Sequence, residues 1–222
     1  MKKVLLFDIE GTTTDIAFVH KVLFPYSLER IEGFVRAHSQ HPAVEGVRQV
    51  LQAEQGVHAS LSDVIEALKL WIRTDRKEAN LKKLQGEIWI EGYQSGAFRG
   101  HVYPEVKEKW QEWKALGYEL AIYSSGSVPA QKLIFGFSLA GDLTPMISAY
   151  FDTSVGHKRE VRSYRNIVEA LKTSPQDVTF FSDIAEELDA ARAAGLATVQ
   201  VFREGLAPSK HRAITSFEEV TL

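Results

Sequence analysis

The sequence predicts an α/β fold: a Rossmann-like parallel sheet core flanked by helices, with an inserted all-helical cap domain. Short continuous apolar runs, of which Val4 to Phe7 is the first, are typical of parallel strands covered on both faces. In residues 15–98, apolar side chains instead recur at three- and four-residue spacing, which is typical of helices. This helical stretch is far longer than the connection that one βαβ crossover needs. We therefore expect a core domain from residues 1–14 and 99–222, and the cap domain from residues 15–98.

The remaining elements alternate strands with helices. Further apolar runs predict strands at 118–123, 178–181 and 196–202. Helical periodicity predicts core helices at 104–117, 130–137, 161–172 and 184–195, and cap helices at 16–38, 44–54, 61–73 and 76–93. Residues 139–155 read as loops around a short apolar piece at Tyr150 and Phe151, and residues 214–220 as a short terminal element. Because the cap leaves from the loop after the first strand, we expect it to act as a lid.

Composition excludes several classes of protein. The 222 residues are 45% hydrophobic and 25% charged, as in ordinary globular domains. A net charge of −3 without a lysine or arginine run argues against a nucleic-acid partner. The absence of cysteine excludes disulfides and thiolate metal sites and fits the cytoplasm. No apolar run has the length of a signal peptide core or a membrane span, so no membrane partner is expected, and a monomer is the default.

Two acids follow the first strand directly. Asp8 falls at the carboxyl end of that strand, where ligands bind in open α/β sheets, and Glu10 follows at the second position after it. Gly11 allows a turn with exposed N–H groups, and the hydroxyls of Thr12 to Thr14 could cradle a phosphate. Acids and threonines are also ordinary turn and helix-cap residues, so the stretch alone fits either a catalytic or a structural role.

A candidate anion site follows the second strand. Ser124 and Ser125 stand between that strand and a helix whose first turn contains Pro129. Free N–H groups and the helix dipole meet at such a point, although serine is also a common helix cap. Lys158, before the helix at 161–172, would bring the positive charge that the site needs. A single lysine in front of a helix is also commonly a solvated residue.

Asp183 follows the strand at 178–181 as Asp8 follows the first strand. Two carboxylates within about 4 Å repel by roughly 4 kcal/mol at an effective dielectric near 20, so they call for a cation between them. Hard oxygen ligands without histidine or cysteine favour Mg²⁺. A carboxylate nucleophile, a magnesium site, a nest of hydroxyl and N–H groups and a lysine predict phosphoryl transfer through an aspartyl-phosphate.

The order of these groups resembles the haloacid dehalogenase superfamily: Asp8-x-Glu10-Gly-Thr, then Ser124-Ser125 after a strand, then Lys158, then Ser182-Asp183. Glu10 departs from that superfamily's usual Asp-x-Asp pair. Longer stretches narrow the resemblance to the enolase-phosphatases of methionine salvage and span nearly the whole chain: DIEGTTT, AFVHKVLFPY, LQGEIW, IYSSGSVPAQKLIFG, FDTSVGHKRE and FFSDIAEELDAA.

The resemblance implies a reaction in two steps. An enolase-phosphatase enolises 2,3-diketo-5-methylthiopentyl 1-phosphate and then removes phosphate, which gives the acireductone 1,2-dihydroxy-3-keto-5-methylthiopentene. Carried over by position, the resemblance makes Asp8 the nucleophile and a ligand of one Mg²⁺, and Asp183 a second ligand. Glu10 becomes a ligand through its backbone carbonyl, and its side chain stays free for proton transfer. Its extra methylene, relative to aspartate, could extend that reach to a substrate carbon or enol oxygen.

The remaining implied roles concern the substrate. Ser124 and Ser125 would hold the phosphate, and Lys158 would bind it and neutralise the charge that grows on the phosphoryl group and the nucleophile. Glu187, four residues past Asp183, would support the ligands from behind.

Two alternatives stay open. A different phosphatase of the superfamily, acting on a sugar or nucleotide phosphate, would use the same core residues and differ in its lid. A phosphate-binding or receiver-type module would accept phosphate on Asp8 without turnover, but the helical insertion argues against it, since a receiver must display its phosphorylated face. A metal-free dehalogenase is disfavoured because it would have no evident use for Glu10.

Overall fold

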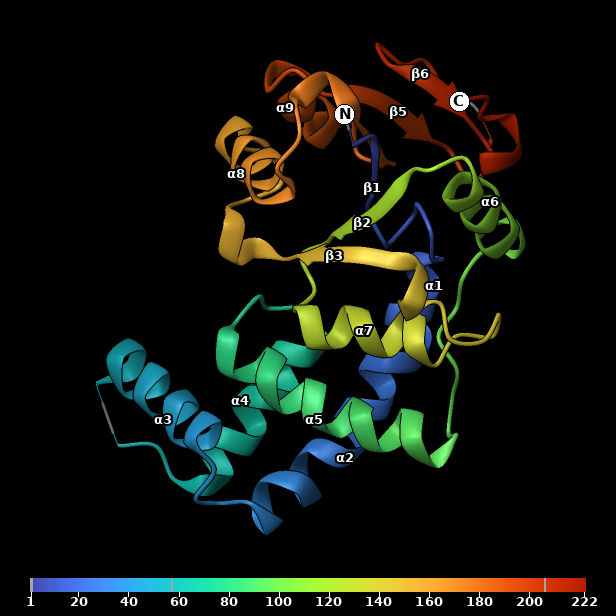
Figure 1. Cartoon of the computed structure of the whole chain (residues 1–222). Coiled ribbons are helices and arrows are strands. Elements are labelled where there is room, and N and C mark those ends of the chain that lie inside the picture. The colour runs from blue at the N-terminus through green and yellow to red at the C-terminus, as the bar shows by residue number, and fades with distance from the viewer. Residues whose placement is uncertain (1, 57, 206) are drawn as a thin grey trace. The chain divides into compact units, whose positions relative to one another are not determined.

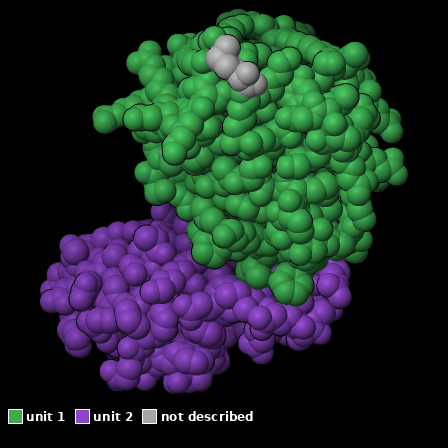
Figure 2. Space-filling view, in the orientation of Figure 1, with its two compact units in different colours: residues 1–16, 100–222 green, residues 17–99 purple. Residues whose placement is uncertain are grey.

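The computed structural model describes residues 2–56, 58–205 and 207–222, and the chain forms two compact units, coloured separately in Figure 2. Unit 1 comprises Met1–Ile16 and Gly100–Leu222, and unit 2 comprises Ala17–Arg99. The sequence predicted divisions at 14/15 and 98/99, and the two compact units divide at 16/17 and 99/100.

Unit 1 contains a six-stranded sheet with the order β3-β2-β1-β4-β5-β6 (Figure 1). Every neighbouring pair of strands is parallel. The strands are β1 (Val4–Phe7), β2 (Glu119–Tyr123), β3 (Ile147–Phe151), β4 (Val178–Ser182), β5 (Ala197–Val201) and β6 (Arg212–Ile214). Phe7 at the end of β1 is in register with Ile122 of β2 and Phe181 of β4. The residues that follow these three strands therefore emerge side by side at one edge of the sheet.

Both faces of the sheet are covered, as the continuous apolar strands predict. On one face, the side chains of α6 (Pro104–Ala115) pack on an aromatic cluster, in which Phe7 stacks on Trp113 at 5.8 Å and on Phe181 at 4.9 Å between ring centroids. On the other face, alternate residues of β1 and β4 pack with α8 (Val161–Leu171) and α9 (Ala185–Ala193). Complete burial of side chains this large stabilises the fold by about 2 to 3 kcal/mol each. The central strands are thus held rigidly.

Both edge strands differ from the sequence expectation. β3 lies in the stretch that was expected to form loops, and β6 was not separated from the chain terminus. Each has a neighbour on one side only, and β3 buries only its first and last residues. A short strand with so little burial lacks the apolar run that identifies β1, β2 and β4. One further helix of unit 1, α7 (Val128–Gly136), follows β2.

The described residues of unit 2 form helices joined by loops. Its helices are α1 (Ile16–Phe18), which begins in the preceding unit, then α2 (Phe24–Ala37), α3 (Pro42–Gln55), α4 (Leu61–Arg73) and α5 (Ala79–Ser95). The single helix predicted for 16–38 is interrupted by a π-helical turn at Val19–Leu23, which ends two residues before Pro25. Proline has no N–H for the regular ladder, and a π turn adapts the chain around such a gap.

The helices of unit 2 enclose a core of their own. Its fully buried side chains come from four helices and include Ile31, Val44, Leu68 and Leu84. Phe24 stacks on Trp89, and Tyr26 packs edge-on against Phe98. No helix in the described ranges is long and apolar enough to cross a bilayer.

Candidate active site

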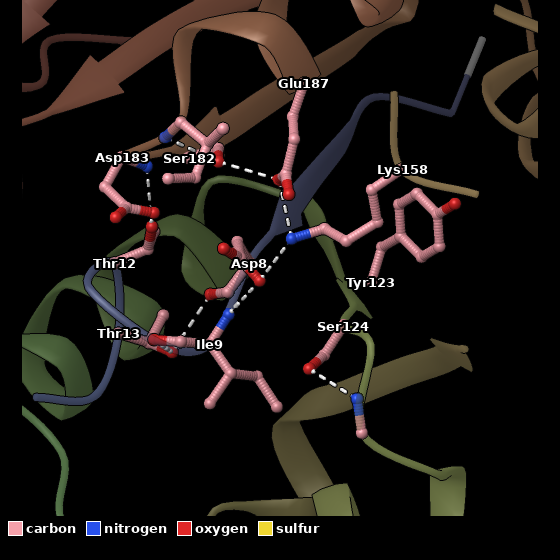
Figure 3. A network of polar contacts seen from close by, with 12 residues as sticks. Asp8, Ile9, Thr12, Thr13, Tyr123, Ser124, Lys158, Ser182, Asp183 and Glu187 are labelled. Atoms are coloured by element: carbon pink, nitrogen blue, oxygen red, sulfur yellow. Dashed lines mark hydrogen bonds and ion pairs between the residues drawn. The ribbon is translucent and has the colours of Figure 1, made fainter. Parts of the chain in front are cut away.

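A polar network lies where β1, β2 and β4 end, and it contains the predicted residues Asp8, Ser124, Lys158 and Asp183 (Figure 3). The strand ends supply Asp8, Ser124 and Asp183, and the loop before α8 supplies Lys158. The sheet order places β1 between β2 and β4, so Asp8 stands between the other two strand ends. Ligands bind in such a crevice in open parallel sheets.

Asp8 is buried and held by its surroundings. Its backbone N–H donates to the carbonyl of Phe181 at 2.9 Å, and its carbonyl accepts the Thr13 hydroxyl at 3.1 Å. In its side chain, Oδ1 accepts the Ile9 N–H at 2.7 Å and contacts Nζ of Lys158 at 2.6 Å. Both of these contacts use Oδ1, and neither uses Oδ2.

A tight turn follows Asp8. The N–H groups of Thr12, Thr13 and Thr14 all donate to the carbonyl of Ile9. Gly11 has φ of +73°, and a Cβ there would lie 2.5 Å from Oδ2 of Asp183. Glycine is therefore required for two reasons, the left-handed backbone and the close approach of a carboxylate. The turn brings the Asp8 loop directly against the end of β4.

Lys158 is fixed through its backbone by a set of hydroxyl groups. Tyr123 donates to the carbonyl of Gly156 at 2.9 Å, Ser163 to that of His157 at 2.7 Å, and Tyr164 to that of Lys158 at 2.6 Å. These donors lie on β2 and α8, which are rigid elements. The lysine is thus a buried residue with a defined position and not a solvated one.

Replacing Tyr164 with phenylalanine is expected to lower the free energy of unfolding by about 1 to 3 kcal/mol, because the buried carbonyl of Lys158 loses its donor. Chemical denaturation measures this. Tyr150→Phe is the matched control, since the buried Tyr150 hydroxyl has no hydrogen-bond partner within the described residues. Equal stability of the two variants would contradict the role given to the Tyr164 hydroxyl.

Lys158 carries its charge between two carboxylates. Its Nζ lies 2.6 Å from Oδ1 of Asp8 and 2.6 Å from Oε2 of Glu187. Burial acts to lower the pKa of Lys158, but the carboxylates of Asp8 and Glu187 outweigh it and the pKa is raised. Glu187 also accepts the Ser182 hydroxyl at 3.0 Å. Burial and the charge of Asp8 raise the pKa of Glu187, whereas Lys158 opposes that shift.

Asp183 is held by its backbone on both sides. Its N–H donates to the hydroxyl of Thr12 at 3.1 Å, and its carbonyl accepts Nε2 of Gln200 at 2.9 Å. Burial, followed by the charge of Asp8, raises the pKa of Asp183 to about 7. Its Oδ1 is buried and makes no hydrogen bond within the described residues. An orphaned carboxylate oxygen of this kind calls for a partner from outside the chain.

The donor set fits a hard divalent cation. Asp8 and Asp183 supply carboxylate oxygens on adjacent strands, and Asp183 Oδ1 lacks a protein partner among the described residues. Mg²⁺ is typically held by one or two carboxylates and keeps several waters. In the described part of the chain, three or more His, Cys, Asp or Glu side chains do not gather into a ready-made metal cluster. Any Mg²⁺ site would therefore rest on these two acids and backbone carbonyls.

The anion site predicted at Ser124 and Ser125 lies before α7. Ser124 is buried, and its Oγ accepts the Gly126 N–H at 3.1 Å. Gln131 of α7 donates to the carbonyl of Gly126 at 2.8 Å and fixes this loop. One N–H of the first turn, that of Val128, already donates to Asp152 at 3.2 Å. The helix N-terminus is therefore partly occupied by the protein itself, which the sequence did not indicate.

Glu10 lies in the turn after Asp8 and is half-buried. Its backbone pairs with Thr14 in an isolated bridge, which fixes the direction in which the turn leaves the sheet. Thr12 was expected to help cradle a phosphate, but its hydroxyl accepts the N–H of Asp183. Another supporting residue, Gln200, was missed by sequence reasoning. Gln200 could have been found, because it is a polar residue within the apolar run of β5, and the structure buries it.

Comparisons with known proteins agree with this geometry. The family model described as a haloacid dehalogenase-like hydrolase matches residues 2–195. The chain is 50% identical over 216 residues to a Pseudomonas fluorescens protein named Enolase-phosphatase E1, covering 97% of this chain and 95% of the relative. It is also 50% identical to the Enolase-phosphatase E1 of Klebsiella pneumoniae subsp. pneumoniae, covering 95% of this chain and 93% of that one.

A solved structure resembles the whole chain. The UTR4 protein (Unknown transcript 4 protein) of Saccharomyces cerevisiae superposes with a TM-score of 0.81 at 32% identity, covering 99% of this chain and all of that one. The fold, the order of the site residues along the chain and the near-complete coverage of the relatives all indicate the same family. The chain therefore belongs to the haloacid dehalogenase-like hydrolases and, within them, to the enolase-phosphatase family.

Proposed function

We propose that the chain is an acireductone synthase that enolises 2,3-diketo-5-methylthiopentyl 1-phosphate and then hydrolyses its phosphate ester. The observation that carries the proposal is the contact of Asp8 with Lys158 at 2.6 Å beside the orphaned carboxylate of Asp183. A carboxylate, a lysine and a candidate metal site are the groups that phosphoryl transfer requires. Relatives that are 50% identical to the chain are named Enolase-phosphatase E1.

Asp8 acts as the nucleophile in the phosphatase step. Its Oδ2 attacks phosphorus, the bond from phosphorus to the substrate oxygen breaks, and an aspartyl-phosphate forms. Water then attacks that phosphorus and regenerates the carboxylate. Lys158, fixed beside Oδ1, neutralises charge on the nucleophile and on the phosphoryl oxygens throughout. Ser124 and Ser125 bind the phosphoryl oxygens from the end of β2.

Asp8, Asp183 and the backbone carbonyl of Glu10 would hold one Mg²⁺ per subunit. When bound, this ion supplies Lewis-acid stabilisation of the charge on the phosphoryl oxygens. Asp183 stays ionised beside it, although burial and Asp8 raise its pKa to about 7 in the chain alone. Glu187 and Ser182 keep Lys158 aimed at Asp8.

The side chain of Glu10 carries protons in both steps. In the enolase step it moves a proton between a substrate carbon and the enol oxygen, and in the phosphatase step it protonates the departing oxygen. Unit 2 serves as the cap that excludes water and selects the methylthio substrate. The substrate is a small phosphorylated diketone; neither nucleic acid nor membrane is a partner. The enzyme works as a cytoplasmic monomer, in keeping with its cysteine-free composition.

The test follows both products. The protein is incubated with the diketo phosphate and Mg²⁺, the enol is followed by ultraviolet absorbance, and released phosphate is measured. The enol signal and phosphate release are both expected. Addition of EDTA is expected to lower phosphate release by roughly 100-fold or more, because Lewis-acid stabilisation is worth several kcal/mol, and excess Mg²⁺ restores it.

Three outcomes would decide against parts of this proposal. Hydrolysis of ordinary sugar phosphates as fast as the diketo compound, without an enol signal, would identify a different phosphatase of the same family. Undiminished turnover in EDTA would remove the magnesium site. Stoichiometric phosphorylation of Asp8 without release would identify a receiver-type module.

A further inference from the structure

Arg203 lies just beyond β5, and only 9% of its side chain is exposed. Its Nε donates to the carbonyl of Thr12 at 2.9 Å, and its Nη2 donates to the same oxygen. Its Nη1 contacts Glu105 of α6 at 2.5 Å. A guanidinium group with this many fixed donors is a rigid brace, since its planar fork sets the direction of each hydrogen bond.

Aromatic rings hold the guanidinium in its plane. Its central carbon lies 3.9 Å from the ring centroid of Tyr103 and 4.9 Å from that of Phe217. The Tyr103 N–H also donates to the carbonyl of Thr13 at 3.1 Å. Arg203 and Tyr103 therefore donate hydrogen bonds to consecutive carbonyls, those of Thr12 and Thr13, in the turn that follows Asp8.

Thr12 connects this brace to both acids of the site. It belongs to the turn whose N–H groups converge on Ile9, directly after Asp8. Its hydroxyl accepts the N–H of Asp183 at 3.1 Å, while its carbonyl is held by Arg203. A shift of Thr12 would move the nucleophile loop and the end of β4 relative to each other.

We propose that Arg203 is a positioning residue for catalysis, which holds Thr12 so that Asp8 and Asp183 keep their mutual geometry. It acts through contact and not through its field, because Glu105, whose side chain is 11% exposed, neutralises its charge. Lysine has no planar fork and cannot reproduce two bonds to one carbonyl together with the pair to Glu105. The inference rests on the proposed function, since its readout is phosphate release.

The main variant is Arg203→Lys, assayed with the diketo phosphate and Mg²⁺. We expect kcat to fall by roughly 10- to 100-fold, as for a displacement of about 1 Å at the reacting groups. KM is expected to change less than about threefold, because Ser124, Ser125 and Lys158 lie on other elements. Arg192→Lys is the matched control: Arg192 also joins a carboxylate, that of Asp189, and a loop carbonyl, but 49% of its side chain is exposed.

A double-mutant cycle separates positioning from plain stabilisation. Thr12→Val removes the hydroxyl that accepts from Asp183. If Arg203 acts through Thr12, Arg203→Lys lowers kcat less in the Thr12→Val background than in the wild type. Additive effects on kcat, or a kcat for Arg203→Lys within about twofold of wild type despite a lower melting temperature, would overturn the proposal.

A second variant tests the same proposal if Arg203→Lys does not fold. Glu105→Gln keeps the size of the partner but removes the charge that fixes Nη1, so Arg203 is held less firmly against Thr12, and we expect kcat to fall by about threefold to tenfold at unchanged KM. An unchanged kcat overturns the proposal. Absence of turnover in the wild-type protein would instead refute the proposed function, which keeps the two failures distinct.

Discussion

Replacing Asp8 with asparagine is expected to abolish phosphate release, with a loss of roughly 10,000-fold or more, since loss of a covalent nucleophile removes the reaction path itself. The amide oxygen of asparagine can still accept the Ile9 N–H, now 2.7 Å from Oδ1, so the backbone of the turn should persist. Lys158 keeps its second partner, Glu187, at 2.6 Å. The loss is therefore chemical and not a collapse of the site. Phosphate release under saturating substrate measures it.

A control variant tests the same acid-to-amide change away from the site. Asp177 immediately precedes β4, at the opposite end of that strand from Asp183. Asp177→Asn should retain kcat within about twofold, because surface and loop changes far from a site rarely alter its chemistry. Phosphate release by Asp8→Asn at a rate close to that of Asp177→Asn would remove Asp8 from the role of nucleophile.

The fold could be predicted from the sequence where burial is continuous. β1 is apolar along its length, β2 and β4 are buried at most positions, and the predicted parallel sheet is confirmed. The edge strands β3 and β6 could not be predicted, because a strand paired on one side and partly exposed carries no continuous apolar run. The π turn before Pro25 is likewise a local response to a missing N–H.

The site could be predicted only as a set of strand ends. Asp8, Ser124 and Asp183 were found because each follows a strand, and parallel strands end at one edge. The supporting contacts join distant positions, such as the 171 residues between Thr12 and Asp183 and the 191 between Thr12 and Arg203. No local pattern marks such pairs. They exist because β5 and the chain after it return to the edge of the sheet beside the first turn.

The structure also shows how charge is balanced in the site. From the sequence, we placed one cation between Asp8 and Asp183 to offset their repulsion, and expected Lys158 to neutralise charge on the nucleophile. The structure shows that Nζ of Lys158 contacts Asp8, whereas the buried Oδ1 of Asp183 has no hydrogen-bond partner within the described residues. Burial and the charge of Asp8 raise the pKa of Asp183 to about 7, so its carboxylate is the one that still calls for a cation.

Glu10→Asp is expected to separate the two reactions, because it restores the usual acid pair of the superfamily and shortens the side chain by about 1.5 Å. If the added methylene of Glu10 provides reach to the substrate carbon, enol formation from the diketo phosphate should fall by roughly 100-fold or more. Hydrolysis of a simple alkyl phosphate without a carbonyl group should stay within about tenfold of wild type, since an aspartate still reaches the departing oxygen. Ultraviolet absorbance and phosphate release measure the two steps.

Two further variants complete the comparison with Glu10→Asp: one that removes the proton carrier and one control at an exposed site. Glu10→Gln removes the proton carrier and should slow both steps, each by roughly 100- to 10,000-fold. Glu29→Asp, the same shortening at a side chain that is 73% exposed on α2, should leave both unchanged. Equal losses of enol formation and alkyl phosphate hydrolysis in Glu10→Asp would mean that the glutamate serves one common step. Its extra methylene would then have no part in the enolase reaction.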